Sequence, residues 1–466
     1  NLLTAPDDDP VEVLDTIFLY STKPDGRKKA RLVVRGDQES TEKRNTYSPT
    51  AAHSTLLTVI AGLSQYQFST CDVKTAFLHA DIDRTVHVRV NGKTYKLLKA
   101  LYGLPDSPRL FHQHLHKVLT NLGFDALATD ACLFRRRQHF ILAYVDDLLV
   151  AAPTSAETEQ IIDELTEHIT IGARGNTQYI GLDISTNEQH IQVSLSTYLD
   201  SLELARFRVS TPVTVDYGRW TQGGGNQQQR GKQRGKEGEK QQTNQELTKQ
   251  MQSNVGIINY IASAARPDLA FASSVLSSRL SNATEQDLQQ AQRALRYAAS
   301  NHWVLTTSRT GPRQVITFVD ASFAMDKGRL SRTGIIVTIA GMPVFWRTQR
   351  QTLVALSTAE AEYVAITEGI KQTVYVSDKL REMGVQHDTP LVLTDSMAAI
   401  QMARQDKVDG RTKHLAIRMQ FTRQHVREGT IKLQHLPGKK QVADFLTKPL
   451  SKASLRKLVE QVMHWK

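Results

Sequence analysis

The sequence predicts a multidomain chain of the mixed α+β and α/β classes. The chain has 466 residues, and at about 150 residues per domain this length allows roughly three domains. Hydrophobic residues make up 40% and charged residues 23%, which excludes wholesale disorder, a coiled coil or a collagen-like chain. Segments with strand-like runs also alternate with segments of helical spacing along most of the chain.

The first half alternates strands and helices. Apolar residues recur at helical spacing from Leu110 to Leu122. Two apolar runs, FILAYV and LLVAAP, flank Asp146 and Asp147 and predict a β-hairpin with both acids at its tip. The other expected elements are strands at 30–36 and 67–73 and helices at 56–63, 156–169 and 195–204.

The second half shows the same mixture. The apolar run VITFV ends at Asp320 and is typical of a buried strand, whereas Ser357 to Met383 predicts a long helix. The other expected elements are helices at 252–264, 285–299 and 397–404 and strands at 334–339, 343–346 and 391–393.

A break in composition separates the two halves. From Thr221 to Gln245 the chain has 25 residues with eight Gln, six Gly and no apolar side chain. Such a segment cannot build a core, so we expect a flexible linker. Its five Lys or Arg and two Glu residues leave open a basic arm that tethers RNA.

The net charge indicates the kind of partner, and the cysteine content indicates the redox compartment. A net charge of +11 points to a polyanionic partner or a basic membrane-facing surface, and nucleic acid is the commoner case. Cys71 and Cys132 allow at most one disulfide, so a reducing compartment is expected. No apolar run reaches the roughly 18 residues of a membrane helix, and we expect a soluble chain with no membrane partner. The start at Asn1 shows no secretory leader, which suggests a fragment of a longer polypeptide.

Three acids in the first half are placed where they can bind cations. Asp72 closes the extended segment FSTCD, and Asp146 and Asp147 sit at the predicted hairpin tip. Neighbouring carboxylates repel one another unless a cation lies between them. Three of them can hold two Mg²⁺ ions, as nucleotidyl transfer requires, although a solvated Asp-Asp turn is the alternative.

Three ordered motifs surround these acids. They are DVKTAFLHADID, KLLKALYGLPDSPRLF and YVDDLLV, at residues 72–83, 96–111 and 144–150. In order and spacing they resemble the reverse transcriptase of copia-type LTR retrotransposon (Pseudoviridae) Pol polyproteins. The resemblance implies a right-hand polymerase with fingers, palm and thumb-like helices. It implies that Asp72 and Asp146 hold metals across the dNTP phosphates and that Asp147 supports the primer terminus.

The same resemblance implies a dNTP-binding set. Phe77 matches the aromatic residue that blocks a ribose 2′-hydroxyl, with a core Phe as the alternative. The segment KKARLVVRG resembles the fingers strand of the family, so Arg31 and, more weakly, Lys29 are expected to contact the triphosphate. Asp106 stands where the family usually has Gln, and a carboxylate near the nucleotide is expected to lower dNTP affinity.

Four acids in the second half have the distribution of a ribonuclease H site. Asp320 ends a strand, Glu362 lies in a helix, Asp395 follows a strand and Asp444 lies near the next helix. Such acids can converge on two metals that flank a scissile phosphate, although each alone is more often a surface cap. Glu360 competes with Glu362, but Ser357-x-x-Glu360 fits a capping box, so we choose Glu362.

Long blocks around these acids resemble copia-type RNase H. They are WRTQRQTLVALSTAEAEYVAI, RTKHLAIRMQF and VADFLTKPL, at residues 346–366, 411–421 and 442–450. His435 resembles the mobile-loop histidine that assists product release or protonates the leaving group. His414 is a family feature whose role the sequence does not give. Arg293 and Arg296 follow a thumb-like segment and are expected to contact phosphates, or else to be solvated.

These features predict five regions. They are reverse transcriptase fingers and palm at 1–212, a linker at 213–250, thumb-like or connection helices at 251–312, an RNase H-like mixed sheet with flanking helices at 313–450, and a helical tail at 451–466.

The resemblance implies an RNA- and DNA-dependent DNA polymerase with RNase H activity that copies retrotransposon RNA into cDNA. Two Mg²⁺ ions per site, replaceable by Mn²⁺, are the implied cofactors. The implied partners are an RNA template, a DNA primer, the RNA/DNA hybrid and dNTPs, with self-association or association with integrase and capsid protein. Virus-like particles in the cytoplasm, with nuclear access of the product, are the implied location. The alternatives are a decayed or repurposed copy that binds nucleic acid without polymerase activity, and a chain that keeps only the nuclease.

Overall fold

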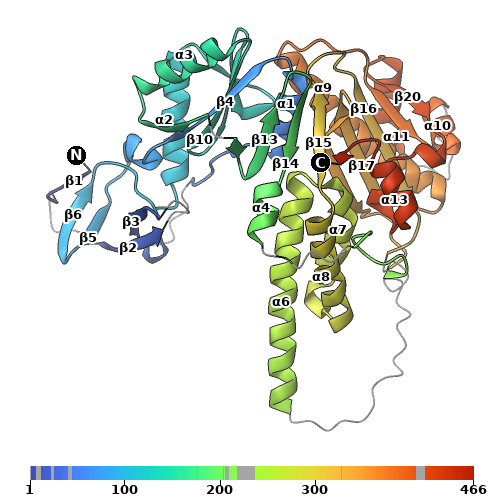
Figure 1. Cartoon of the computed structure of the whole chain (residues 1–466), viewed down its shortest axis with the longest axis horizontal. Coiled ribbons are helices and arrows are strands. Elements are labelled where there is room, and N and C mark those ends of the chain that lie inside the picture. The colour runs from blue at the N-terminus through green and yellow to red at the C-terminus, as the bar shows by residue number, and fades with distance from the viewer. Residues whose placement is uncertain are drawn as a thin grey trace. The chain divides into compact units, whose positions relative to one another are not determined.

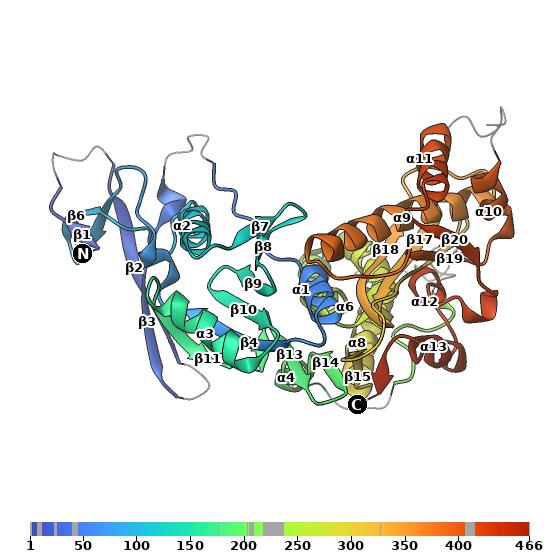
Figure 2. The ribbon, with the colours of Figure 1, turned by 90° about the horizontal axis from the view of Figure 1, so that it is seen from above.

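The computed structural model places the chain in two compact units, each described by itself below (Figures 1 and 2). The N-terminal unit comprises residues 1–52 and 66–180, and the C-terminal unit comprises residues 53–65 and 181–466. The structure describes residues 2–6, 12–22, 26–39, 45–175, 177–202, 204, 209–217, 237–326, 328–405 and 415–465. Residues 218–236 of the predicted linker and His414 therefore lie outside the described residues.

A six-stranded sheet forms the main layer of the N-terminal unit, in the order β11-β4-β10-β9-β8-β7. Its β9-β10 hairpin confirms the one predicted around Asp146 and Asp147. Alternate residues of these two strands, such as Ile141 and Leu148, are buried against two helices, as a period of two requires. The bounds are β4 (Gln67–Val73), β7 (Asp125–Leu127), β8 (Asp130–Arg136), β9 (His139–Tyr144), β10 (Asp147–Ala152), β11 (Ile171–Arg174), α2 (Ser107–Asn121) and α3 (Ser155–Thr166).

A second sheet of this unit has the order β1-β6-β5-β2-β3 and a small core of its own. Gly103 of the LYGL segment permits the close approach of the edge strand β3, because a Cβ at this glycine would lie 2.0 Å from the Val34 carbonyl oxygen. The Val34 N–H donates to the Tyr102 carbonyl at 2.8 Å. The bounds are β1 (Leu3–Thr4), β2 (Leu14–Thr22), β3 (Lys28–Val34), β5 (His87–Val90) and β6 (Lys93–Leu97); β12 (Gln178–Tyr179) ends the unit.

The C-terminal unit is built on a mixed sheet with the order β18-β17-β16-β19-β20. The β16, β17 and β18 strands are antiparallel, whereas β16, β19 and β20 are parallel. This is the mixed sheet with flanking helices that the sequence predicts, and α9 crosses β16 and β17. The bounds are β16 (Val315–Ser322), β17 (Arg332–Ile339), β18 (Met342–Arg350), β19 (Leu391–Thr394), β20 (Lys432–His435), α9 (Thr358–Glu382), α10 (Met397–Arg404), α11 (Ala416–Arg427) and α12 (Asp444–Thr447).

A group of helices and a small sheet complete this unit. Helices α6, α7 and α8 pack together, and α7 contacts β18. Helix α1 also packs on β18, and its Leu56, Leu57 and Ile60 are fully buried. The bounds are α1 (His53–Gly62), β13 (Leu182–Thr186), β14 (His190–Ser194), α4 (Ser196–Ser201), α6 (Glu237–Ala264), α7 (Ala270–Ser277), α8 (Glu285–Ser300), β15 (Trp303–Ser308), α13 (Lys452–Val459) and β21 (His464–Trp465).

The structure divides the chain differently from the five predicted regions. Residues 53–65 and 181–212 were expected with the polymerase but belong to the C-terminal unit, because β14 pairs with β15 and α1 packs on β18. Helix α6 begins at Glu237, so the linker expected to reach 250 ends earlier. The expected helical tail also contains β21, whose Trp465 pairs with Trp303. Local sequence patterns carry no signal for such distant partners. No helix in the described parts of the chain is long and apolar enough to span a membrane.

Candidate active sites

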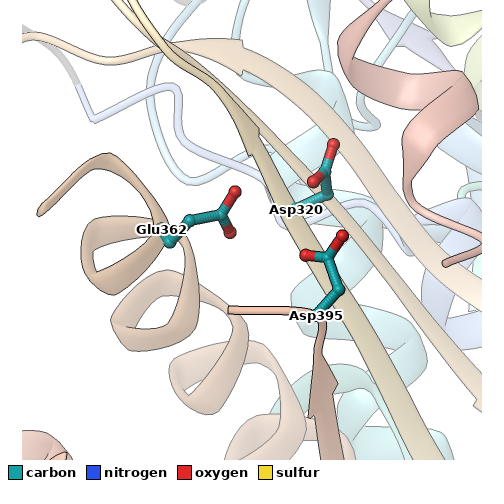
Figure 3. Close-up of side chains that lie close together, drawn as sticks. All are labelled: Asp320, Glu362 and Asp395. Atoms are coloured by element: carbon teal, nitrogen blue, oxygen red, sulfur yellow. The ribbon is translucent and has the colours of Figure 1, made fainter. Parts of the chain in front are cut away.

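Three acids of the C-terminal unit meet at one point of its sheet. The ligand oxygens of Asp320, Glu362 and Asp395 lie within 4.8 Å of one another. Figure 3 shows Glu362 reaching from a helix toward Asp320 on a strand and Asp395 at a strand end. Segments far apart in the sequence therefore bring these three predicted site residues together.

The pairing of β16 and β19 explains why two of the acids meet. The strands are parallel, with Phe318 opposite Leu393, so Asp320 and Asp395 both lie two residues beyond this pair. Residues two apart in a strand share one face, and these two positions therefore project at the same edge region of the sheet. Thr394 and His435 are likewise paired in β19 and β20, which sets His435 beside the acids.

The structure separates the two glutamates that compete in the sequence. Ser357 caps α9, and the Glu360 carboxylate accepts a hydrogen bond from the Leu356 N–H at 2.8 Å. Glu362 instead accepts a hydrogen bond through Oε1 from the Ala321 N–H of β16 at 3.2 Å. Its side chain is 5% exposed, and its Oε2 atom has no hydrogen-bond partner among the described residues. The Glu360 carboxylate thus bonds the backbone just before the helix, and Glu362 points into the cluster.

The fourth acid, Asp444, is carried to the cluster by α12. The Gln441 amide donates to the Val319 carbonyl at 2.9 Å, and the Thr348 hydroxyl donates to the Leu446 carbonyl at 2.9 Å. The hydroxyl of Thr447 donates to the Asp320 carboxylate. These bonds fix the short helix against β16 and β18, and Asp444 itself lies 2.9 Å from Lys448 Nζ.

Gly334 permits the close approach of α12, and its replacement should damage the site. A Cβ at this position would lie 2.7 Å from Thr447 Cγ2 and 2.9 Å from Leu446 Cβ. We expect Gly334→Ala to destabilise the chain by about 1–3 kcal/mol. The substitution should reduce hybrid cleavage more than primer extension, because α12 must shift. Thermal unfolding and both assays check this, with Gly256→Ala as the control, since nothing lies within 4 Å of a Cβ there.

Burial and mutual repulsion control the protonation of these acids. Burial first, and then Asp320 and Asp395, raise the pKa of Glu362 to about 9. The pKa values of Asp320, Asp395 and Asp444 are also raised, chiefly by burial. Lys448 opposes each of these shifts. Without a cation, the cluster therefore favours protonated carboxyl groups.

These shifts predict that the metal-free protein loses stability as the pH rises. Unfolded Glu362 releases its proton near pH 4.5, whereas the folded group keeps it until about pH 9. The unfolded state thus binds fewer protons between these values, so the free energy of unfolding falls across that window. We expect the melting temperature in EDTA to decline less steeply with pH in Glu362→Gln. The control is Glu368→Gln on the same helix, whose carboxylate pairs with Lys371. A decline equally steep in Glu362→Gln and the wild type would contradict the prediction.

The chemistry of the cluster fits a divalent metal. Carboxylate oxygens are the ligands that Mg²⁺ and Mn²⁺ prefer. The unpaired Oε2 of Glu362 is a buried acceptor directed toward Asp320 and Asp395, and a cation there would satisfy it. Asp320, Glu362, Asp395 and Asp444 are therefore the residues that would hold such an ion.

The acids of the N-terminal unit form a second, looser group. Asp72 on β4 lies directly opposite Asp147, the first residue of β10. Asp146 occupies the hairpin turn, where Val145 has a φ of 53° and the Asp146 carbonyl accepts from the Val73 N–H at 2.7 Å. The β4-β10 pairing thus brings the three predicted acids to one end of two strands.

This second group is more open than the first. The Asp72 carboxylate accepts a hydrogen bond from the Ala173 N–H at 2.5 Å. Burial, followed by Asp146 and Asp72, raises the pKa of Asp147 to about 6. Among the described residues, the ligand oxygens of Asp320, Glu362 and Asp395 lie within 4.8 Å of one another, whereas those of Asp72, Asp146 and Asp147 do not. The acids of the N-terminal unit are therefore farther apart. They are close enough to repel one another, as a cation site requires.

An aromatic residue that the sequence reasoning missed links the predicted dNTP-binding residues. Tyr102 lies edge-on to Phe77, with 4.7 Å between ring centroids. The Arg31 guanidinium lies over the same ring at 5.6 Å. Burial and then Asp146 raise the pKa of Tyr102, which places this ring near the acids. Phe77 is half-buried, and Lys29 lies on β3 with Arg31. In the sequence, the tyrosine of the LYGL motif is the feature that could have identified this residue.

Asp106 is buried and paired with an arginine. Its carboxylate is 3% exposed and accepts hydrogen bonds from Arg84 Nε at 2.9 Å and Nη2 at 3.1 Å. Burial acts to raise the pKa of Asp106, but the bonds from Arg84 prevail and lower it. Arg84 also pairs with Glu39 at 2.6 Å, and the effect of Asp106 on dNTP affinity stays a prediction.

A histidine and two arginines complete the set of predicted residues that the structure describes. His435 is exposed at the end of β20, and its ring interacts electrostatically with Asp395. The Arg293 guanidinium is held by Thr211, through its carbonyl at 3.1 Å and its hydroxyl at 3.0 Å. Arg296 bonds through Nε to the Gln292 carbonyl at 3.3 Å. Contact of either arginine with phosphates stays a prediction.

Comparison with known proteins connects these sites to a family. Residues 4–215 match the family described as reverse transcriptase (RNA-dependent DNA polymerase). The chain is 28% identical over 464 residues to the retrovirus-related Pol polyprotein from transposon TNT 1-94 of Nicotiana tabacum, covering 92% of this chain and 34% of that protein. It is 27% identical to the Pol polyprotein from transposon RE1 of Arabidopsis thaliana, covering 96% and 31%. The chain thus spans about a third of the length of these relatives.

Solved structures show a similar fold. A foamy viral protease-reverse transcriptase in complex with double-stranded DNA superposes with a TM-score of 0.55 at 16% identity, covering 91% of this chain and 65% of that one. A second, in complex with an RNA/DNA hybrid, has a TM-score of 0.51 at 14% identity, covering 94% and 52%. Residues 4–215 thus match the reverse transcriptase family, and nearly the whole chain is similar to a part of retrotransposon Pol polyproteins.

Proposed function

We propose that the chain is an RNA- and DNA-dependent DNA polymerase that also degrades the RNA strand of RNA/DNA hybrids. The observation that carries the proposal is the presence of two separate carboxylate groups, Asp72, Asp146 and Asp147 in one unit and the cluster around Asp320 in the other. The match of residues 4–215 to the reverse transcriptase family supports the first activity, and the sheet order of the C-terminal unit supports the second.

The polymerase residues have distinct proposed roles. Asp72 and Asp146 hold Mg²⁺, and Asp147 supports the primer terminus. Arg31 binds the triphosphate of the incoming dNTP as a planar cation. Phe77, whose ring contacts that of Tyr102, excludes a ribose 2′-hydroxyl. When bound, Mg²⁺ supplies Lewis-acid activation of the attacking oxygen and neutralises charge on the phosphate.

The ribonuclease residues act on the hybrid. Asp320, Glu362, Asp395 and Asp444 would hold the metal, and a bound metal would supply the positive charge that attracts the RNA phosphate. His435, which is exposed and interacts electrostatically with Asp395, transfers a proton at the leaving oxygen or assists product release. The net charge of +11 favours binding of the hybrid through its phosphates, with affinity that falls as salt rises.

Primer extension on an RNA template tests the proposed polymerase. We expect the intact chain with Mg²⁺ and dNTPs to extend a DNA primer and to stop when EDTA is added. Extension with dNTPs should exceed extension with rNTPs. A chain that binds the primed template but incorporates no nucleotide would instead be a nucleic-acid-binding protein without polymerase activity.

A further inference from the structure

A lysine side chain enters the acid cluster of the C-terminal unit. Lys448 Nζ lies 2.9 Å from Asp444 Oδ1, and its side chain is 43% exposed. The same ammonium group interacts electrostatically with Asp320 and Asp395. One cation therefore faces three of the four acids proposed above to hold metal.

The backbone fixes this lysine at the cluster. The Lys448 N–H donates to the Asp444 carbonyl at 3.2 Å, and the residue caps α12 in an extended conformation, with φ −149° and ψ 153°. Pro449 follows, and a proline disfavours helical backbone in the residue before it. The turn that ends α12 thus directs the side chain back to a residue of its own helix.

The charges at this point are unbalanced without Lys448. Four carboxyl groups lie close together, three of them with oxygens within 4.8 Å of one another. A neighbouring positive charge favours their ionised forms and offsets their repulsion. The same charge repels an incoming divalent cation, because both compete for Asp444 and Asp320.

We propose that Lys448 is a positioning residue that holds the ribonuclease carboxylates in place before metal binds and weakens the affinity of the site for Mg²⁺. The proposal rests on the ribonuclease function proposed above. It has two opposite consequences, since Lys448 stabilises the metal-free protein and destabilises the metal-bound one. An ordinary surface ion pair between Lys448 and Asp444 would produce neither a selective change in Mg²⁺ affinity nor a change of this sign.

The test compares Lys448→Met, Lys448→Arg and the wild type as full chains. Melting temperature in EDTA and its rise on Mg²⁺ titration are the measurements, and Asp395→Asn identifies the part of the Mg²⁺ response that belongs to this site. We expect Lys448→Met to have a lower melting temperature in EDTA. It should reach half-saturation at a Mg²⁺ concentration lower than that of the wild type by up to about tenfold. Lys448→Arg should resemble the wild type, and Lys457→Met, on the exposed face of α13, is the control.

Each outcome decides the role of Lys448. Unchanged or weaker Mg²⁺ affinity in Lys448→Met would overturn the proposal while leaving the ribonuclease function intact. If Asp395→Asn responds to Mg²⁺ as strongly as the wild type does, the proposed metal site itself is overturned, and so is the proposed role of Lys448. Tighter Mg²⁺ binding combined with a lower melting temperature in EDTA supports the proposal, and the arginine variant shows that the charge is responsible.

Discussion

Asp146→Asn is expected to abolish primer extension while leaving hybrid cleavage intact. Asp146 occupies the turn between β9 and β10, next to the paired Asp72 and Asp147. The substitution removes a negative charge from a group that must hold a cation but keeps the size of the side chain. We expect extension to fall at least about a thousandfold, equivalent to about 4 kcal/mol of transition-state free energy.

Single-turnover extension of a DNA primer on an RNA template measures this effect. Asp125→Asn is the matched control, because Asp125 is an exposed acid on β7 of the same sheet. Thermal unfolding of both variants separates a catalytic loss from a folding defect. Wild-type incorporation by Asp146→Asn would show that polymerisation does not depend on the YVDD acids.

Asp395→Asn is expected to have the complementary effect. Asp395 contributes an oxygen to the cluster with Asp320 and Glu362, and it follows a strand that other interactions hold in place. Loss of one ligand charge should reduce cleavage of the RNA strand by at least about a thousandfold, with primer extension unchanged. The substitution also relieves repulsion among buried carboxyl groups, so the metal-free protein should become slightly more stable.

Cleavage of a labelled RNA strand in a preformed hybrid is the measurement. Asp378→Asn serves as the control, since this acid of α9 forms an exposed pair with Arg381. Lower stability of Asp395→Asn in EDTA, relative to the wild type, would contradict the account of the cluster as a repulsive group. Persistent RNA cleavage would remove Asp395 from the proposed machinery.

Much of the fold follows from local patterns in the sequence. The two apolar runs FILAYV and LLVAAP predict the β9-β10 hairpin, and the helical segment from Ser357 to Met383 corresponds to α9 within one residue at each end. The Ser357 cap pattern also predicts different tasks for Glu360 and Glu362, and the two carboxylates accept hydrogen bonds from different segments, at Leu356 and at Ala321. These are short-range features, so one segment of sequence contains the whole signal.

The rest depends on partners distant in the chain. Helix α1 has an apolar sequence that fits either unit, and its packing against β18 decides where it belongs. Asp106 acts as a buried partner of Arg84, which lies 22 residues away. Tyr102 and Lys448 stand within recognised motifs, but their contacts with Arg31 and with the acid cluster require three-dimensional positions. Side-chain roles of this kind follow from tertiary pairing and cannot be deduced from periodicity.

One assay tests the central claim that a single chain carries two independent active sites. A DNA primer annealed within a longer labelled RNA lets extension and RNA cleavage be followed in the same reaction with Mg²⁺ and dNTPs. The wild type should perform both reactions, Asp146→Asn only cleavage, Asp395→Asn only extension, and the double variant neither. Loss of both activities in either single variant, with its fold intact, would contradict the assignment of two independent sites.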